Sequence, residues 1–196
     1  MEKMEEFLTE LDIQKETTTD DLPEIDLYMD QVIQLFEKKF AGAKRLDEEK
    51  VLTKTMINNY AKAKLFPPVK NKRYTKEHLM LISLIYQMKG VLSITDIKET
   101  LHGINDRLDD DDFNFTSFYK SYQNLVFHNT DIFTKQIQDH TAAVKDELKN
   151  SMDVADAEEL ENILLITSLA SLSNLYRRAA ESLIDELNGE QQEKEK

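Results

Sequence analysis

The chain contains no cysteine, which excludes disulfides, thiolate metal sites, a cysteine nucleophile and thiol redox switching. Glycine and proline are almost as scarce, at four and three among 196 residues. That is too few for a β-sandwich or barrel, in which turns recur roughly every 8–12 positions. The longest apolar stretch, residues 163–175, is interrupted by polar residues and falls short of the about 20 needed to span a bilayer. We therefore expect an all-α protein without a membrane span.

Motifs for catalysis and metal binding are also missing. There is no glycine-rich phosphate loop, no nucleophile elbow, no dinucleotide fingerprint and no His-Glu-x-x-His pair. The run Asp109–Asp112 lacks the spaced ligands, central glycine and final glutamate of an EF-hand. We predict no enzymatic activity, no cofactor and no tightly bound metal. The four histidines have no ligand-like spacing and are interpreted as surface or packing residues: His78, His102, His128 and His140.

Charge is abundant and unevenly distributed. The net charge is −13, which by itself argues against a nucleic-acid partner. Between Thr53 and Lys76, however, seven basic residues occur without one acid, a local charge of +7. The other 172 residues therefore carry −20, since −13 minus +7 is −20. Because salt confines the influence of a charge to about 10 Å, this basic segment can meet phosphate while the acidic remainder faces away.

The pattern along the chain predicts four parts. Residues 1–21 form an N-terminal arm, 22–106 a helical domain, 107–188 a region of long helices, and 189–196 a disordered tail. The N-terminus alternates acids with other residues and lacks the basic and apolar regions of a signal peptide, so we expect a cytoplasmic protein.

Within 22–106, apolar spacing and capping residues predict four helices. The first covers about 24–40 and the second about 54–65, capped by Thr53. Two prolines and four polar or basic residues make 67–74 an extended or hairpin-like loop, which allows a small two-stranded wing in the otherwise all-α fold. Thr75 begins a third helix that ends at Gly90. Ser93 begins a short fourth one through Leu101, with Asp96 completing a capping box.

Three blocks of this domain resemble the MerR winged helix-turn-helix in the right order. The run MINNYAKAKLFPP at 56–68 is similar to the recognition segment TLRYYERLGLLPP without a gap. KRYTKEHL at 72–79 resembles the following RYYSEEDL, and SITDI at 93–97 resembles SLEEI. The match departs at Asn58, where the motif has arginine, and at Lys64, where it has glycine.

A second resemblance covers about residues 20–105. IDLYMDQ at 25–31 followed by LTKTMINNY at 52–60 is similar to the YkrK-like family of Bacillus-type bacteria, a domain of unknown function. It implies a bacterial origin and no particular activity.

The MerR resemblance implies a DNA-binding transcription regulator with a recognition helix at about 53–65 and a basic wing at 67–74. A helix in the major groove needs short polar side chains for base edges and cations for phosphate, and asparagine suits adenine. Tyr60 is interpreted as a core residue. The alternative function is a protein–protein interaction module that uses the same scaffold, favoured by the acidic net charge and by Asn58. The predicted DNA-binding residues are Thr53, Lys54, Thr55, Asn58, Asn59, Lys62, Lys70, Lys72 and Arg73.

The region 107–188 shows two long amphipathic patterns. Aromatic residues from Phe113 to Tyr122 at helical spacing are interpreted as core, with an effector pocket as the alternative. A heptad-like seam in the second helix, flanked by further apolar residues, predicts a homodimer through about 155–187 that Leu172→Asp would dissociate. An unidentified small-molecule or protein effector remains open. The seam residues are Leu165, Leu169, Leu172, Tyr176, Ala179 and Leu183.

Overall fold

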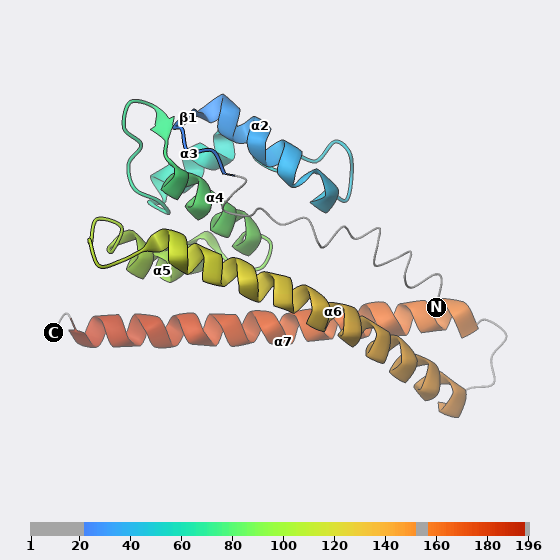
Figure 1. Cartoon of the computed structure of the whole chain (residues 1–196). Helices are drawn as coiled ribbons and strands as arrows, with labels where there is room; N and C mark the ends of the chain where they lie inside the picture. The colour runs from blue at the N-terminus through green and yellow to red at the C-terminus, as the bar shows by residue number, and fades with distance from the viewer. Residues whose placement is uncertain (1–21, 152–156, 195–196) are drawn as a thin grey trace.

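The computed structural model describes residues 22–151 and 157–194 (Figure 1). The described residues form six α-helices, one short 3-10 helix and one two-stranded antiparallel sheet, which confirms the expected all-α fold with a small sheet. The arm predicted for 1–21 lies outside these residues. The elements are β1 (Leu27–Tyr28), α2 (Met29–Lys39), η2 (Ala41–Ala43), α3 (Lys54–Lys62), β2 (Arg73–Tyr74), α4 (Lys76–Met88), α5 (Ile94–Asn105), α6 (Phe115–Ser151) and α7 (Ala157–Lys194).

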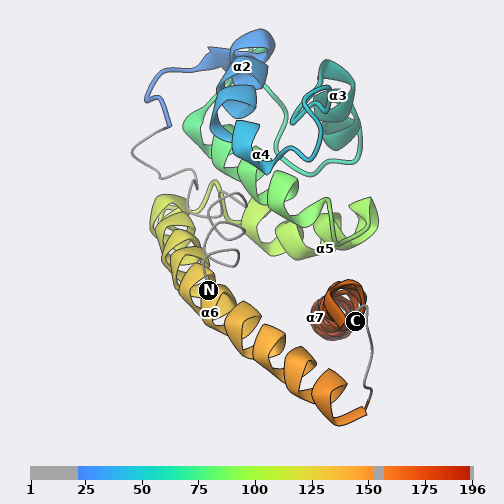
Figure 2. The same cartoon turned by 90° about the vertical axis from the view of Figure 1, so that its right-hand side faces the viewer.

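Helix α4 is the centre of the packed part of the molecule. Every residue from His78 to Ile85 is buried, because this run is apolar on all sides apart from His78 and Ser83. Such a helix is stable only when other elements surround it. Figure 2 shows α2 and α3 on one side of α4, with α5 and α6 on the other. One core cluster extends from Leu22 to Tyr119, and we call this unit, residues 22–122, the head.

The first helix begins later than predicted. The sequence suggested 24–40, whereas α2 covers Met29–Lys39 and residues 27–28 form β1. Leu27 pairs with Tyr74 of β2, which turns its side chain into the core, and Ile25 is 69% exposed. Helical spacing around residue 25 carries no information about a strand partner that lies far along the chain, so the prediction was wrong there.

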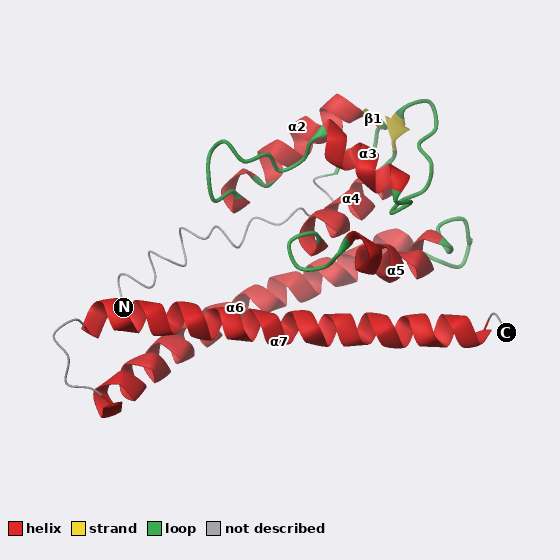
Figure 3. Cartoon of the chain, turned by 180° about the vertical axis from the view of Figure 1, so that it is seen from behind, coloured by secondary structure: helices red, strands yellow, loops and turns green. Residues whose placement is uncertain are grey.

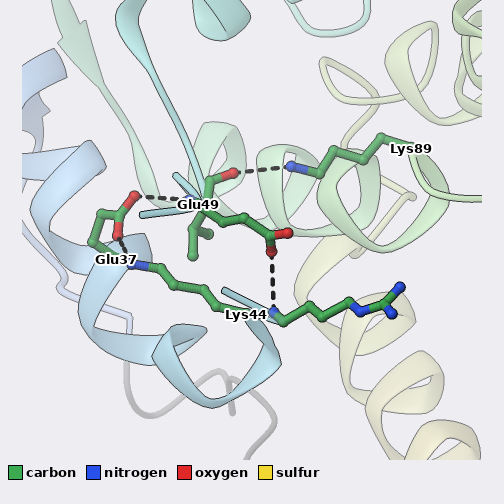
Figure 4. A network of polar contacts seen from close by, with 6 residues as sticks. Glu37, Lys44, Glu49 and Lys89 are labelled. Carbon is green, nitrogen blue, oxygen red and sulfur yellow. Dashed lines mark hydrogen bonds and ion pairs between the residues drawn. The ribbon is translucent and has the colours of Figure 1, made fainter. Parts of the chain in front are cut away.

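The connector between α2 and α3 is fixed by a polar network (Figure 4). One Glu37 carboxylate oxygen accepts a hydrogen bond from the Val51 amide at 2.8 Å, and the other lies 2.6 Å from the Lys44 ammonium. The ammonium of Lys89, the C-cap residue of α4, donates to the Val51 carbonyl at 2.9 Å. Lys44 is the main cause of a pKa of the Glu37 carboxyl below its ordinary value. These contacts hold the long connector so that Val51 and Leu52 enter the core.

The predicted helix starts at Thr53, Thr75 and Ser93 are confirmed as N-caps. The Ser93 hydroxyl accepts from the Asp96 amide at 3.1 Å, which is the expected capping box. Helix α4 does end before Gly90, but no glycine among the described residues has a positive φ, so the expected left-handed glycine cap is absent. Helix α5 continues one turn past Leu101, to Asn105.

Two long helices leave the head. Helix α6 starts against α4 and runs outward, and α7 returns past it and contacts α5 (Figures 1 and 3). Phe115 and Tyr119 are buried in the head core, as expected for the aromatic cluster, whereas Phe118 is 44% exposed. The packed unit thus includes the first turns of α6, beyond residue 106. Helix α7 continues to Lys194, through most of the segment predicted as a tail.

Candidate nucleic-acid interface

Helix α3 has one buried and one exposed side. Ile57 and Tyr60 are buried in the core, and burial raises the pKa of the Tyr60 hydroxyl. This confirms Tyr60 as a packing residue. The opposite side carries four exposed residues at i, i+3, i+4 and i+7, which lie on one helix face. We call this face the α3 stripe: Thr55, Asn58, Asn59 and Lys62.

Thr53 and Lys54 are placed differently from the stripe. The Thr53 hydroxyl caps α3 by accepting from the Met56 amide at 3.2 Å, and the residue is half-buried. The Lys54 ammonium lies 2.8 Å from the Asp30 carboxylate in the first turn of α2. Both are therefore occupied with contacts inside the chain.

Helix α3 ends in a left-handed residue that is not glycine. Lys64 has φ 58°, and the Leu65 amide donates to the Tyr60 carbonyl while the Lys64 amide donates to that of Ala61. This double hydrogen bond is the Schellman arrangement, in which the left-handed position is usually glycine. It ends the helix at Lys62, three residues earlier than predicted. Asn105 of α5 secures the turn by donating from its side-chain amide to the Leu65 carbonyl at 3.2 Å.

The predicted wing forms a tight hairpin. Lys70 and Arg73 form an antiparallel bridge, and the Arg73 amide donates to the Lys70 carbonyl at 2.9 Å. Asn71 and Lys72 between them have φ 52° and 59°. Two left-handed residues make a two-residue type I′ turn, whose second position usually holds glycine. All four side chains are exposed, and the turn leads into β2.

Arg73 is oriented by a neighbouring ring. Its guanidinium carbon lies 4.9 Å from the centroid of the Tyr28 ring, and its Nη2 donates to the Tyr28 hydroxyl at 3.2 Å. Tyr28 belongs to β1, whose register places it opposite Arg73. The sequence analysis placed Tyr28 in the first helix, at about 24–40, and so did not predict its contact with Arg73.

The basic segment is less positive in space than in sequence. Lys76 pairs with Glu24, and Lys54 pairs with Asp30. These two acids precede the basic segment in the chain and offset two of its seven charges, which leaves five. The five remaining cations are exposed and come from the end of α3 and from the hairpin: Lys62, Lys64, Lys70, Lys72 and Arg73.

Helix α3 and the 64–73 loop lie at the same end of the head, on the far side of α4 from α7 (Figures 1, 2 and 3). Eight of the nine predicted DNA-binding residues have exposed side chains at this end of the head, including Lys54, which pairs with Asp30. Thr53 is half-buried and caps α3. Lys64 was missed by the sequence reasoning, although the glycine of the MerR motif at this position was a signal.

His78 links the wing to α4. It is buried, its Nδ1 lies 3.2 Å from the Thr75 amide and 2.9 Å from the Thr75 hydroxyl, and its Nε2 lies 3.1 Å from the Pro67 carbonyl oxygen. The carbonyl can only accept, so Nε2 carries the hydrogen and Nδ1 is the acceptor. Desolvation by burial lowers the pKa of His78. This histidine is a packing residue, as expected.

Comparison with known families identifies the family of the chain. A model described as a domain of unknown function, DUF1836, matches residues 17–122. The chain belongs to the DUF1836 family. The DUF1836 match ends in the second turn of α6, close to where the core of the head ends. No curated protein and no solved structure matches the chain significantly.

Two absences hold for the described part of the chain. None of its helices is both long and apolar enough to cross a membrane. In the same residues, no three or more histidine, cysteine, aspartate or glutamate side chains lie together so that they could hold a metal ion.

Proposed function

We propose that the head is a DNA-binding module of a transcription regulator, with α3 as the recognition helix and the hairpin at 70–73 as a short wing. The α3 stripe offers two asparagines, which suit the N6 and N7 atoms of adenine, and a threonine. The exposed cations at the end of α3 and on the hairpin would contact phosphate on either side of a groove. The order of helix, connector, second helix and basic hairpin supports this reading by analogy with winged helix-turn-helix proteins.

The observation that carries the proposal is the placement of two lysines in left-handed backbone. Lys64 and Lys72 both occupy positions where glycine would be free of strain. A side chain in this conformation costs roughly 1 kcal/mol. Backbone strain of this kind clusters at functional sites, where it is offset by the surrounding structure. Lys64 directly follows α3 and Lys72 lies in the hairpin, and the strain at both positions supports a use for their positive charge.

The second candidate is an interaction module that presents the same face to a protein partner. The ion pairs of Lys54 and Lys76 favour it, because they reduce the positive charge available for phosphate. It shares the residues of the first candidate and differs from it in the partner.

Salt-dependent DNA binding tests the proposal. Full-length protein is titrated against a labelled mixed-sequence duplex, and anisotropy is followed over a range of salt. Each phosphate contact contributes about 0.9 to the slope of log affinity against log salt. Replacing Lys62, Lys70 and Lys72 with alanine should flatten that slope by roughly 2–3.

The matched control removes three exposed lysines of α6, Lys120, Lys135 and Lys145. It changes the net charge equally and should leave the slope as it is in the wild type. Absence of duplex binding at low salt, or an equal slope in all three proteins, contradicts the DNA proposal and leaves the interaction module.

A further inference from the structure

Helix α7 has two apolar sides in its C-terminal half, and only one of them is covered. Ile184 is 5% exposed on the side where α7 packs on α5. On another side, four large apolar residues are between 47% and 61% exposed. We call this surface the open seam: Leu175, Tyr176, Ala179, Leu183 and Leu187.

The open seam continues a face that is already covered in the first half of α7. Leu165, Leu169 and Leu172 are half-buried where α7 passes α6, whose Ile137 and Val144 are buried. Tyr176, Ala179 and Leu183 repeat the same alternation of three and four residues. Figure 2 shows the first part of α6 lying away from α7. Before residue 173, α6 thus covers this apolar face of α7. After residue 173, no helix among the described residues covers the same face.

The open seam carries one charge, Glu186, which is exposed next to Leu187 near the end of the seam. On another side of α7, Arg177 forms an ion pair with Glu181 at 2.8 Å, and both are half-buried. The four large side chains expose about 100 Å² each, roughly 400 Å² in total, which is near the upper end for patches on monomers. Two copies would bury roughly 800 Å² from these side chains alone, which falls below about 1,200 Å², in the range of weak, reversible interfaces.

We propose that the open seam binds the same surface of a second copy of the chain, with the two α7 helices antiparallel. A twofold axis requires self-complementarity, in which residue i meets j and j meets i. An axis between Ala179 and Ala180 places Tyr176 of each copy opposite Leu183 of the other, and Leu172 opposite Leu187. The small side chain of Ala179 near the crossing allows close approach of the helices, and antiparallel macrodipoles attract.

The residues of this interface differ from those of the dimer that the sequence predicts. Leu165 and Leu169 are half-buried within the chain, and Leu172→Asp would disturb that packing as well as a dimer. Tyr176 and Leu183 are 58% and 61% exposed, so charged replacements there leave the fold intact. The proposal does not depend on DNA binding.

Analytical ultracentrifugation of the full chain measures the assembly. The concentrations run from about 1 to 100 µM, on the order of those at which weak interfaces assemble. The wild type should be a dimer. Tyr176→Glu combined with Leu183→Glu should raise its dissociation constant by on the order of 100-fold while the helical circular dichroism is retained. The matched control Leu125→Glu changes a leucine of α6 that is 62% exposed and should stay dimeric.

The cysteine-free chain allows a second readout. Ala179→Cys should form a disulfide-linked dimer under mild oxidation, since the axis brings the two copies of this residue together. Ala170→Cys, exposed on another side of α7, should not. A monomeric wild type at the highest concentration, a dimer that survives the double variant, or equal cross-linking of the two cysteine variants overturns the proposal.

Discussion

The head and the long helices use their apolar residues in opposite ways. Among the described residues, 25 apolar residues are buried, of which 22 lie between Leu22 and Tyr119 and the other three lie on α6 and α7. Among the same residues, 17 large apolar residues are exposed, of which twelve lie on α6 and α7. The head buries most of its apolar side chains within itself, whereas the long helices leave many of their large apolar side chains exposed to solvent. The chain therefore has a packed domain followed by two long helices that expose many of their large apolar side chains.

The largest expected effect is on the free energy of unfolding, and it compares the same leucine-to-alanine substitution in the head and in a long helix. Leu81→Ala in α4 removes a fully buried side chain and should lower the free energy of unfolding by about 2–5 kcal/mol. Leu125→Ala in α6, at a position that is 62% exposed, should change it by less than about 0.5 kcal/mol. Urea denaturation at low protein concentration measures both. Similar losses for the two variants would break the comparison.

An intermediate effect comes from the buried histidine of the head. The folded-state pKa of His78 lies below the ordinary value of 6.5, so below pH 6.5 the unfolded chain takes up the proton first. The free energy of unfolding should then fall with decreasing pH, by at most about 1.4 kcal/mol per pH unit, until the folded-state pKa is reached. Protonation would also add a hydrogen to Nδ1, the acceptor of the Thr75 amide.

The comparison for this effect is His78→Asn, which keeps an acceptor for the Thr75 amide without titrating in this range. Its free energy of unfolding should decline less than that of the wild type between pH 7 and 5, whereas His128→Asn on exposed α6 should follow the wild type. Glu37 acts in a different window, since its lowered pKa removes stability only as the pH falls below about 4.5. Parallel pH profiles for the wild type and the His78 variant would contradict the assignment.

The smallest effect is a gain. Lys64→Gly should raise the free energy of unfolding by roughly 0.5–1 kcal/mol, because glycine adopts a left-handed backbone without strain. Lys62→Gly, two residues earlier in right-handed helix, should lower it by up to about 1 kcal/mol. Thermal and urea unfolding measure the two changes. Loss of stability in the Lys64 variant would mean that its side chain, and not the backbone, dominates at this position.

Local signals in the sequence were sufficient for much of the fold. The caps at Thr53, Thr75 and Ser93 depend on residues within one turn, so the sequence alone identified them. The hairpin at 70–73 followed from the helix-breaking residues around it. Residues 27–28 could not be assigned correctly, because their conformation depends on pairing with 73–74.

The candidate site shows the same limit. The exposed residues of α3 were foreseen because helical spacing defines a face once the helix is known. The pairing of Lys54 with Asp30, and of Lys76 with Glu24, joins residues from separate elements and was not visible in the local charge of +7. Lys64 and Lys72 adopt a left-handed backbone conformation, which lysine rarely takes, so their residue type did not predict it.

We propose that Lys64 and Lys72 supply positive charge at a nucleic-acid interface in spite of the backbone strain at both positions. The most direct test is the double variant Lys64→Gly/Lys72→Gly, with the free energy of unfolding and the affinity for a mixed-sequence duplex measured in the same buffer near 0.1 M salt. We predict higher stability together with weaker DNA binding, by roughly tenfold for each lysine. A variant that is more stable and binds the duplex as tightly as the wild type would contradict the claim.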